Sequence, residues 1–129
     1  MRKLAENWIA YAYADLRAAE KLVGDFELTG IATFHCQQCV EKSLKAMLAL
    51  HASQIPRIHD LVTLHKRVSE VETLPVNVSE LLQLNDAYID VRYPNDPTAS
   101  ARTTPSERKT EEFVMLATKI HDFCRSAFD

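Results

Sequence analysis

Two cysteines, Cys36 and Cys39, have the spacing of a zinc-binding or redox-active pair, and His35 stands beside them. A structural zinc ion takes four ligands, and the sequence has no second cysteine pair to supply the other two. The third cysteine, Cys124, and a histidine could supply these two ligands only if folding brought them close to Cys36 and Cys39. Because a free cysteine in a protein core behaves as a small hydrophobic side chain, we expect Cys36 and Cys39 to be packed inside the protein. A thiol or zinc site at this pair is the alternative, and we otherwise expect no metal and no cofactor.

A run of polar side chains on the same stretch could form one wall of a groove: Gln38, Glu41, Lys42 and Lys45. Lysine ammonium groups bind phosphate oxygens, so an anion is the expected class of ligand. Glu41 and Lys45 are also four residues apart on a helix, in the order that favours an ion pair. The same residues could therefore form a solvated face held by side-chain pairs, and both interpretations stay open.

Arg92-Tyr93 supplies the facing part of this candidate groove. A planar guanidinium suits phosphate oxygens, and the tyrosine ring could stack on a base. An arginine at the end of a helix is equally favoured by the helix dipole alone. We expect the helices that carry Lys42 and Arg92 to run in the same direction, which would place Arg92 nearer Lys42 than His35, with His59 at the rim. The candidate ligand-binding residues, none of them catalytic, are Gln38, Lys42, Lys45, His59, Arg92 and Tyr93.

Helices must position these groups, because apolar residues recur at three- and four-residue steps along almost the whole chain. The expected helices cover residues 4–23, Thr29 to about His51, a shorter stretch after Asp60, Asn77 to Val91, and the region after the cap residue Thr104. Gly24 is expected to close the first helix in the left-handed conformation. The predicted fold is all-α, an antiparallel up-and-down bundle of four to five helices that forms a single domain over residues 1–129.

Composition excludes several classes of protein. The chain has 129 residues, the length of one domain, and 15 basic against 18 acidic residues give a net charge of −3. This balance argues against nucleic-acid binding through bulk positive charge. With 2 glycines, a glycine-lined phosphate loop is not expected. No apolar signal segment follows Met1, and the longest apolar run, Ala46 to Leu50, is far too short to span a membrane. We therefore expect a cytoplasmic protein with free thiols and no membrane partner.

Several short strings occur along these helices in a distinctive order. They are Trp8, Asp15-Leu16, Phe34-His35-Cys36-Gln37-Gln38-Cys39-Val40-Glu41-Lys42-Ser43-Leu44-Lys45-Ala46, His59-Asp60-Leu61, and Tyr88-Ile89 through Arg92-Tyr93-Pro94. In this order and spacing they resemble the HEPN family, small bacterial and archaeal helical proteins often encoded beside a minimal nucleotidyltransferase. The resemblance implies a helical bundle that usually forms a homodimer.

Family members with catalytic activity are metal-independent endoribonucleases, in which an arginine is followed, after four to six residues, by a histidine. The histidine can exchange protons with the ribose or the leaving group, and the arginine can stabilise phosphate charge. In this sequence Pro97, Thr98 and Ala99 occupy the places where a histidine would follow Arg92, and no other arginine and histidine have the required spacing.

The prediction is therefore a non-catalytic module that binds a nucleotide or RNA phosphate and works with a minimal nucleotidyltransferase, as in a toxin–antitoxin pair. A metal-independent ribonuclease toxin that sets a distant histidine, such as His59, against Arg92 is the second hypothesis. The Cys-x-x-Cys site is the third.

Overall fold

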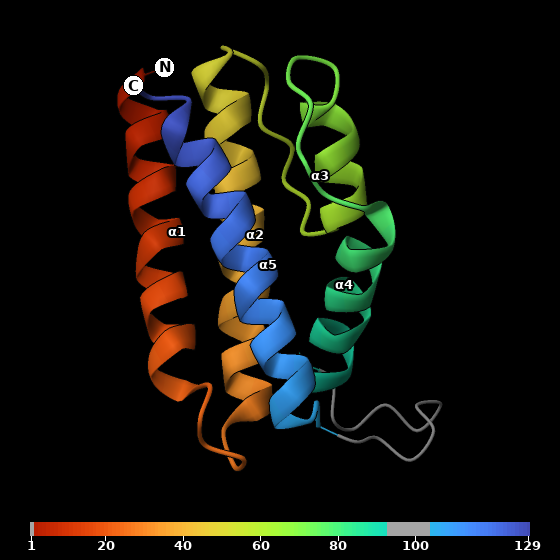
Figure 1. Ribbon diagram of the computed structural model, residues 1–129. Coiled ribbons are helices and arrows are strands. Elements are labelled where there is room, and N and C mark those ends of the chain that lie inside the picture. The colour runs from red at the N-terminus through yellow and green to blue at the C-terminus, as the bar shows by residue number, and fades with distance from the viewer. Residues whose placement is uncertain (1, 93–103) are drawn as a thin grey trace.

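The computed structural model describes residues 2–92 and 104–129, and the side chains of these residues except 89–92. The described chain is helical and contains no strand (Figure 1). Its helices are α1 (Arg2–Leu22), α2 (Thr29–Leu50), α3 (Leu61–Val68), α4 (Val78–Arg92) and α5 (Glu107–Ser126). This confirms the predicted all-α bundle. None of these helices combines the length and the apolar character that crossing a membrane requires.

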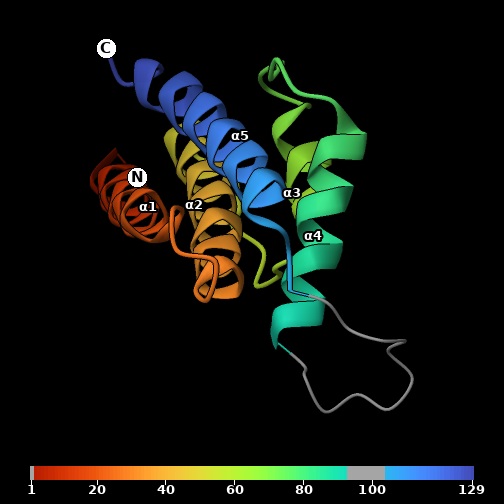
Figure 2. The same cartoon turned by 60° about the horizontal axis from the view of Figure 1, so that its bottom comes forward.

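The second helix, α2, is the centre of the bundle. It packs against each of the other four helices, and Figure 2 shows it enclosed between α1, α5 and the pair formed by α3 and α4. Large apolar side chains such as Leu44 and Met47 are fully buried on it. Because neighbours cover α2 on several sides, its buried residues include polar ones, among them Gln37, Glu41 and Lys45.

Side-chain caps begin three of the helices, as the sequence predicts. The Asp60 carboxylate accepts a hydrogen bond from the backbone N–H of Val62 at 2.9 Å and caps α3. Before α4, the backbone N–H of Asn77 donates to the Glu80 carboxylate at 3.2 Å. The cap of α5 is Ser106 rather than Thr104, since the Ser106 hydroxyl accepts from the backbone N–H of Lys109 at 3.0 Å.

The predicted left-handed cap at Gly24 is wrong. No described glycine has a positive φ, and α1 ends at Leu22, where the Asp25 N–H bonds the Leu22 carbonyl at 3.1 Å. The left-handed residue follows α2 instead, at Ala52, with a φ of 54°. There the Ser53 N–H bonds the Leu48 carbonyl at 2.8 Å, which is the long bond of a Schellman motif.

The expected common direction of α2 and α4 is also wrong. The connector after α2 (residues 51–60) returns along that helix, so that His59 lies beside Gln37, while Glu72, after α3, lies 4.0 Å from His51. The short α3 therefore runs parallel to α2, and α4 runs back antiparallel to both. The stacked rings of Phe34 and Tyr88, with centroids 6.0 Å apart, place the last turns of α4 beside the first half of α2.

The two chain ends meet at one end of the bundle (Figure 1). The guanidinium of Arg2 donates a hydrogen bond to the Phe128 carbonyl at 2.6 Å and lies over the Phe128 ring, 5.3 Å from its centroid. This contact joins the first turn of α1 to the end of α5.

The three cysteines belong to the core, as expected of small hydrophobic side chains. Cys36, Cys39 and Cys124 are free thiols and are fully buried. Burial raises the pKa of Cys39 to about 12, and it raises the pKa values of the other two thiols well above the ordinary range. The thiolate is the form that attacks disulfides and binds metals, so this environment does not favour a redox or zinc site.

We expect the native thiols to be unreactive toward a disulfide reagent at about pH 8, because burial disfavours the thiolate and blocks access. In urea all 3 cysteines should react rapidly. Absorbance of the released aromatic thiol measures both rates. Fast modification of one or two thiols in the folded protein would contradict the core assignment.

Candidate functional site

Asp15 joins α1 to the polar side of α2. Its Oδ1 lies 2.9 Å from the Nδ1 of His35, and its Oδ2 accepts a hydrogen bond from the Lys42 ammonium at 2.7 Å. The inner face of α1 carries small residues at regular spacing, including Ala12 and Ala19, which are fully buried. Such residues let two helices approach closely, so the short Asp15 side chain reaches α2 while being only 9% exposed.

Glu41 is the centre of a second group of polar contacts. Its Oε2 accepts from the Lys45 ammonium at 2.9 Å, and its Oε1 accepts from the Gln37 amide at 3.3 Å. Both carboxylate oxygens also lie 3.1 Å from the Nδ1 of His59, which belongs to the connector. The Glu41 and Lys45 side chains are 5% and 6% exposed, so this is a buried ion pair that further hydrogen bonds complete.

Two glutamine amides extend this group along α2. The Gln38 amide donates to Gln37 at 2.8 Å, and the Gln37 amide donates to the His59 carbonyl at 3.1 Å. The result is a polar face that runs from α1, across α2, to the connector. We call it the α2 polar face, formed by Asp15, His35, Gln37, Gln38, Glu41, Lys42, Lys45 and His59.

Both histidines of the α2 polar face present the same ring nitrogen to a carboxylate. Because carboxylate oxygens only accept hydrogen bonds, the Nδ1 of His35 and the Nδ1 of His59 must each carry a proton. The two rings differ in access, since the His59 side chain is 70% exposed and the His35 side chain is 27% exposed.

Charges on the α2 polar face cancel within the chain. Lys42 is paired with Asp15 and Lys45 with Glu41, and the Lys45 ammonium also lies 5.4 Å from the ring centroid of Trp8. An anion that approached either lysine would also meet the negative charge of a nearly buried carboxylate. The contacts therefore agree with the side-chain pairing of the sequence-based alternative, but that alternative expected a solvated face, and the Glu41 and Lys45 side chains are buried.

The structure brings together four of the predicted ligand-binding residues, Gln38, Lys42, Lys45 and His59, within this network. Arg92 is the last residue of α4, one turn beyond Tyr88, so its backbone lies toward the His35 end of α2 and not beside the later turns. The Arg92 side chain and the whole of Tyr93 lie outside the described residues.

Four residues of the α2 polar face are absent from the predicted ligand-binding residues: Asp15, His35, Gln37 and Glu41. Of these, Asp15 and Gln37 were not considered for the groove at all. A signal was present for Asp15, since it follows Trp8 and Tyr11 at helical spacing, and a carboxylate on a partly apolar stripe needs a partner. For Gln37 the sequence offers no comparable signal, because its partner, the His59 carbonyl, is a backbone atom of the distant connector.

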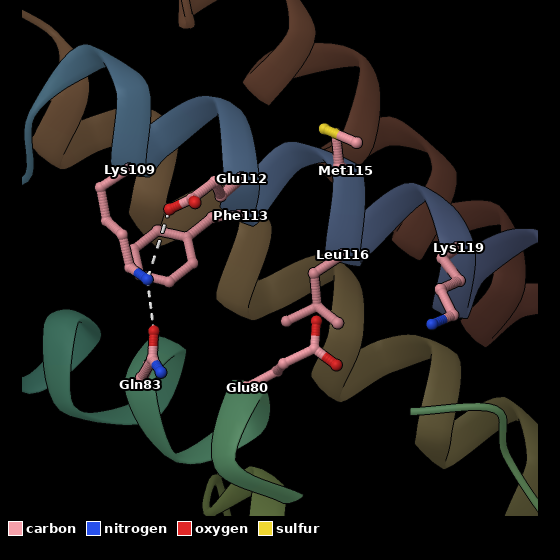
Figure 3. A pocket seen from close by; sticks show the side chains of 8 residues that line it. All are labelled: Glu80, Gln83, Lys109, Glu112, Phe113, Met115, Leu116 and Lys119. Atoms are coloured by element: carbon pink, nitrogen blue, oxygen red, sulfur yellow. Dashed lines mark hydrogen bonds and ion pairs between the residues drawn. The ribbon is translucent and has the colours of Figure 1, made fainter. Parts of the chain in front are cut away.

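A separate groove of about 590 Å³ lies between α4 and α5 (Figure 3). Lys109 crosses it, contacting Gln83 of α4 and pairing with Glu112 at 3.4 Å, and its ammonium sits over the Phe113 ring. The Glu80 carboxylate at the other wall already serves the cap of α4. The contact between Lys109 and Gln83 joins the two helices across the groove, and the charge of Lys109 is already paired with Glu112 of its own helix.

Replacing Glu41 by glutamine should lower the free energy of unfolding by about 3 kcal/mol, because the buried Lys45 ammonium then loses its counter-charge. Urea denaturation measures this change. The matched control is Glu6→Gln, which breaks the exposed Arg2–Glu6 pair and should cost less than about 1 kcal/mol. Adding Lys45→Met to Glu41→Gln should restore much of the loss. Equal effects of the two single changes would contradict a buried pair.

Comparison with known proteins is consistent with this architecture. The family model of the HEPN domain matches residues 5–127. The crystal structure of TT1696 from Thermus thermophilus is 29% identical, with a TM-score of 0.79 over 98% of each chain. That of ST0689, an archaeal HEPN homologue, is 24% identical, with a TM-score of 0.72 over 97% of this chain and 98% of that one. No curated protein matches this chain.

The family match spans nearly the whole chain, and its residue range includes all five helices apart from the first turn of α1. The order and direction of the helices that form the α2 polar face are shared with the two solved structures over almost their full lengths. On this basis the chain belongs to the HEPN domain family.

Proposed function

We propose that this protein is a non-catalytic, homodimeric HEPN module that works with a minimal nucleotidyltransferase, in the manner of a toxin–antitoxin pair. Its role in such a pair is to bind the partner protein. Family membership supports the class of partner, and the chemistry of the α2 polar face supports the non-catalytic role.

The main support for the non-catalytic role is that Lys42 and Lys45 are each paired with a carboxylate of the same chain. A phosphoryl or ribonuclease site needs cations that face the substrate, yet the Lys42 and Lys45 ammonium groups lie 2.7 and 2.9 Å from carboxylate oxygens of their own chain. Removing these carboxylates from their lysines would leave buried charges without partners, at a cost of several kcal/mol. The arrangement favours a rigid polar surface over an anion-binding cleft.

The absence of the family's arginine–histidine spacing from the sequence supports the same conclusion. A contact to a nucleotide or RNA phosphate would fall to Arg92, because both lysines of the α2 polar face are already paired with carboxylates. His59, the histidine of the ribonuclease hypothesis, donates its Nδ1 proton to Glu41 and lies beside the middle of α2. The end of α4 lies nearer to Phe34, so the fold does not favour a His59–Arg92 pair.

We expect the tagged protein to retain the nucleotidyltransferase encoded next to it when the two are co-expressed and purified at physiological salt. Size-exclusion chromatography with light scattering then gives the mass of the complex. An unrelated nucleotidyltransferase of similar size serves as the control. Lack of such a neighbouring gene, or equal retention of the control enzyme, would argue against the proposed partner.

The purified protein should leave RNA intact in the presence of a metal chelator, because no positioned histidine can activate the ribose hydroxyl. Gel analysis of a labelled RNA measures cleavage, and the Arg92→Ala and His59→Ala variants should give the same result as the native chain. Metal-independent cleavage that disappears in either variant would establish the ribonuclease hypothesis in its place.

A further inference from the structure

The groove between α4 and α5 exists because each of these helices packs on α2 more than on the other. We call it the α4–α5 groove. It has a volume of about 590 Å³, and the residues that line it include Glu80, Gln83, Lys109, Phe113, Leu116 and Lys119 (Figure 3). The contact between Lys109 and Gln83 closes one end, and Lys119 lies at the other. A volume of this size is within the range of ligand-binding clefts.

The floor of the α4–α5 groove is apolar. Phe113 and Leu116, about one turn apart on α5, belong to the hydrophobic core, and Figure 3 shows Leu116 directed across the groove toward Glu80 of α4. Met115, at the outer side of α5, is 72% exposed. The flexible thioether of methionine adapts to the shape of a bound partner. An apolar side chain that enters the groove would therefore be removed from water between Leu116 and the α4 wall.

Three of the four charges along the α4–α5 groove are already compensated. Lys109 pairs with Glu112 at 3.4 Å. Glu80 lies in the first turn of α4, where the helix dipole favours a carboxylate and the backbone N–H of Asn77 donates to it at 3.2 Å. Lys119 is exposed and has no ion pair within the described residues. The uncompensated charge of the groove is therefore positive, although the chain as a whole carries −3.

The apolar floor and Lys119 are separated by about one helical turn. At 1.5 Å per residue, the midpoint between Phe113 and Leu116 lies about 7 Å from Lys119 along α5. Residues four positions apart on a helix lie on one face, about 6 Å apart along its axis. A helix that carries an apolar residue and an acidic residue at this spacing therefore matches the groove in both distance and charge. This is the helix-in-groove mode of recognition.

We infer that the α4–α5 groove is the docking site of the partner protein, and that its occupant is an amphipathic helix of that protein. The helix places an apolar side chain on Leu116 and a carboxylate beside the Lys119 ammonium. The apolar contact supplies the buried area, and the charge pair at the rim fixes the orientation of the helix. The inference rests on the partner-binding role proposed above and specifies the surface that performs it.

Replacing Lys119 by glutamate should weaken binding of the nucleotidyltransferase encoded next to this protein at least tenfold, because like charges then meet at the rim. Isothermal titration calorimetry at physiological salt measures the dissociation constant, and circular dichroism checks that the variant is folded. The matched control is Lys3→Glu, which makes the same change at an exposed lysine of α1 and should bind like the native chain. Gln83→Trp, which fills the groove from the α4 wall, should also weaken binding at least tenfold.

Photo-cross-linking identifies the occupant of the groove. The native cysteines are buried, so Met115→Cys provides an accessible thiol for a benzophenone maleimide, and mass spectrometry should locate the cross-link on a partner helix with an acidic residue four positions from an apolar one. A native chain that does not bind the nucleotidyltransferase would overturn both the proposed partner and this inference. Native affinity in a folded Lys119→Glu variant, or cross-links to a segment of other chemistry, would overturn the groove alone. Loss of a dimeric mass in Lys119→Glu would assign the groove to a second copy instead.

Discussion

Glu41 and Lys45 carry opposite charges on successive turns of α2, and the bundle buries both of them. Burial of a charge costs several kcal/mol unless a partner and further hydrogen bonds compensate for it. The pair supplies the counter-charge, but the Glu41 carboxylate needs additional donors, which come from Gln37 and from His59. Because His59 belongs to the connector after α2, the requirement to satisfy one carboxylate constrains the path of a distant segment.

That path determines the order of the remaining helices. The connector descends along α2 until His59 reaches Glu41, and α3 can begin only there, capped by Asp60. It consequently runs parallel to α2, and α4 returns antiparallel to both. Asn85 of α4 closes this arrangement, since its side-chain oxygen accepts a hydrogen bond from the backbone N–H of Leu61 at 3.2 Å.

Local signals explain why much of the fold is readable from the sequence. Helical periodicity and the caps at Asp60 and Asn77 depend on residues a few positions apart, and all of these features are present. The direction of α3 depends instead on contacts between residues 18 to 24 positions apart, such as His59 with Glu41 and Leu61 with Asn85. Short-range patterns contain no information about such contacts, which is why the direction of α4 was predicted wrongly.

In the candidate site, too, some features depend on residues close in the sequence and others on contacts between distant segments. Helical spacing explains why Gln38, Lys42 and Lys45 could be selected as neighbours, but no short-range pattern places His59, 18 residues from Glu41, beside them. The sequence left open whether the lysines face a ligand or carboxylates of the chain. For Lys42 that question is decided by Asp15, 27 residues away, whose role follows from the close approach that small residues allow between α1 and α2. For Lys45 it is decided by Glu41, on the preceding turn of the same helix.

The contact between Arg2 and Phe128 has a consequence for protein engineering. Because the two termini lie side by side, a chain segment joined to either one leaves the bundle at the same end, opposite the end of α4 (Figure 1). Neighbouring termini are the usual condition for circular permutation. A short linker could therefore join them, and new ends could be opened in an exposed turn such as that around Phe26 without interrupting the central helix.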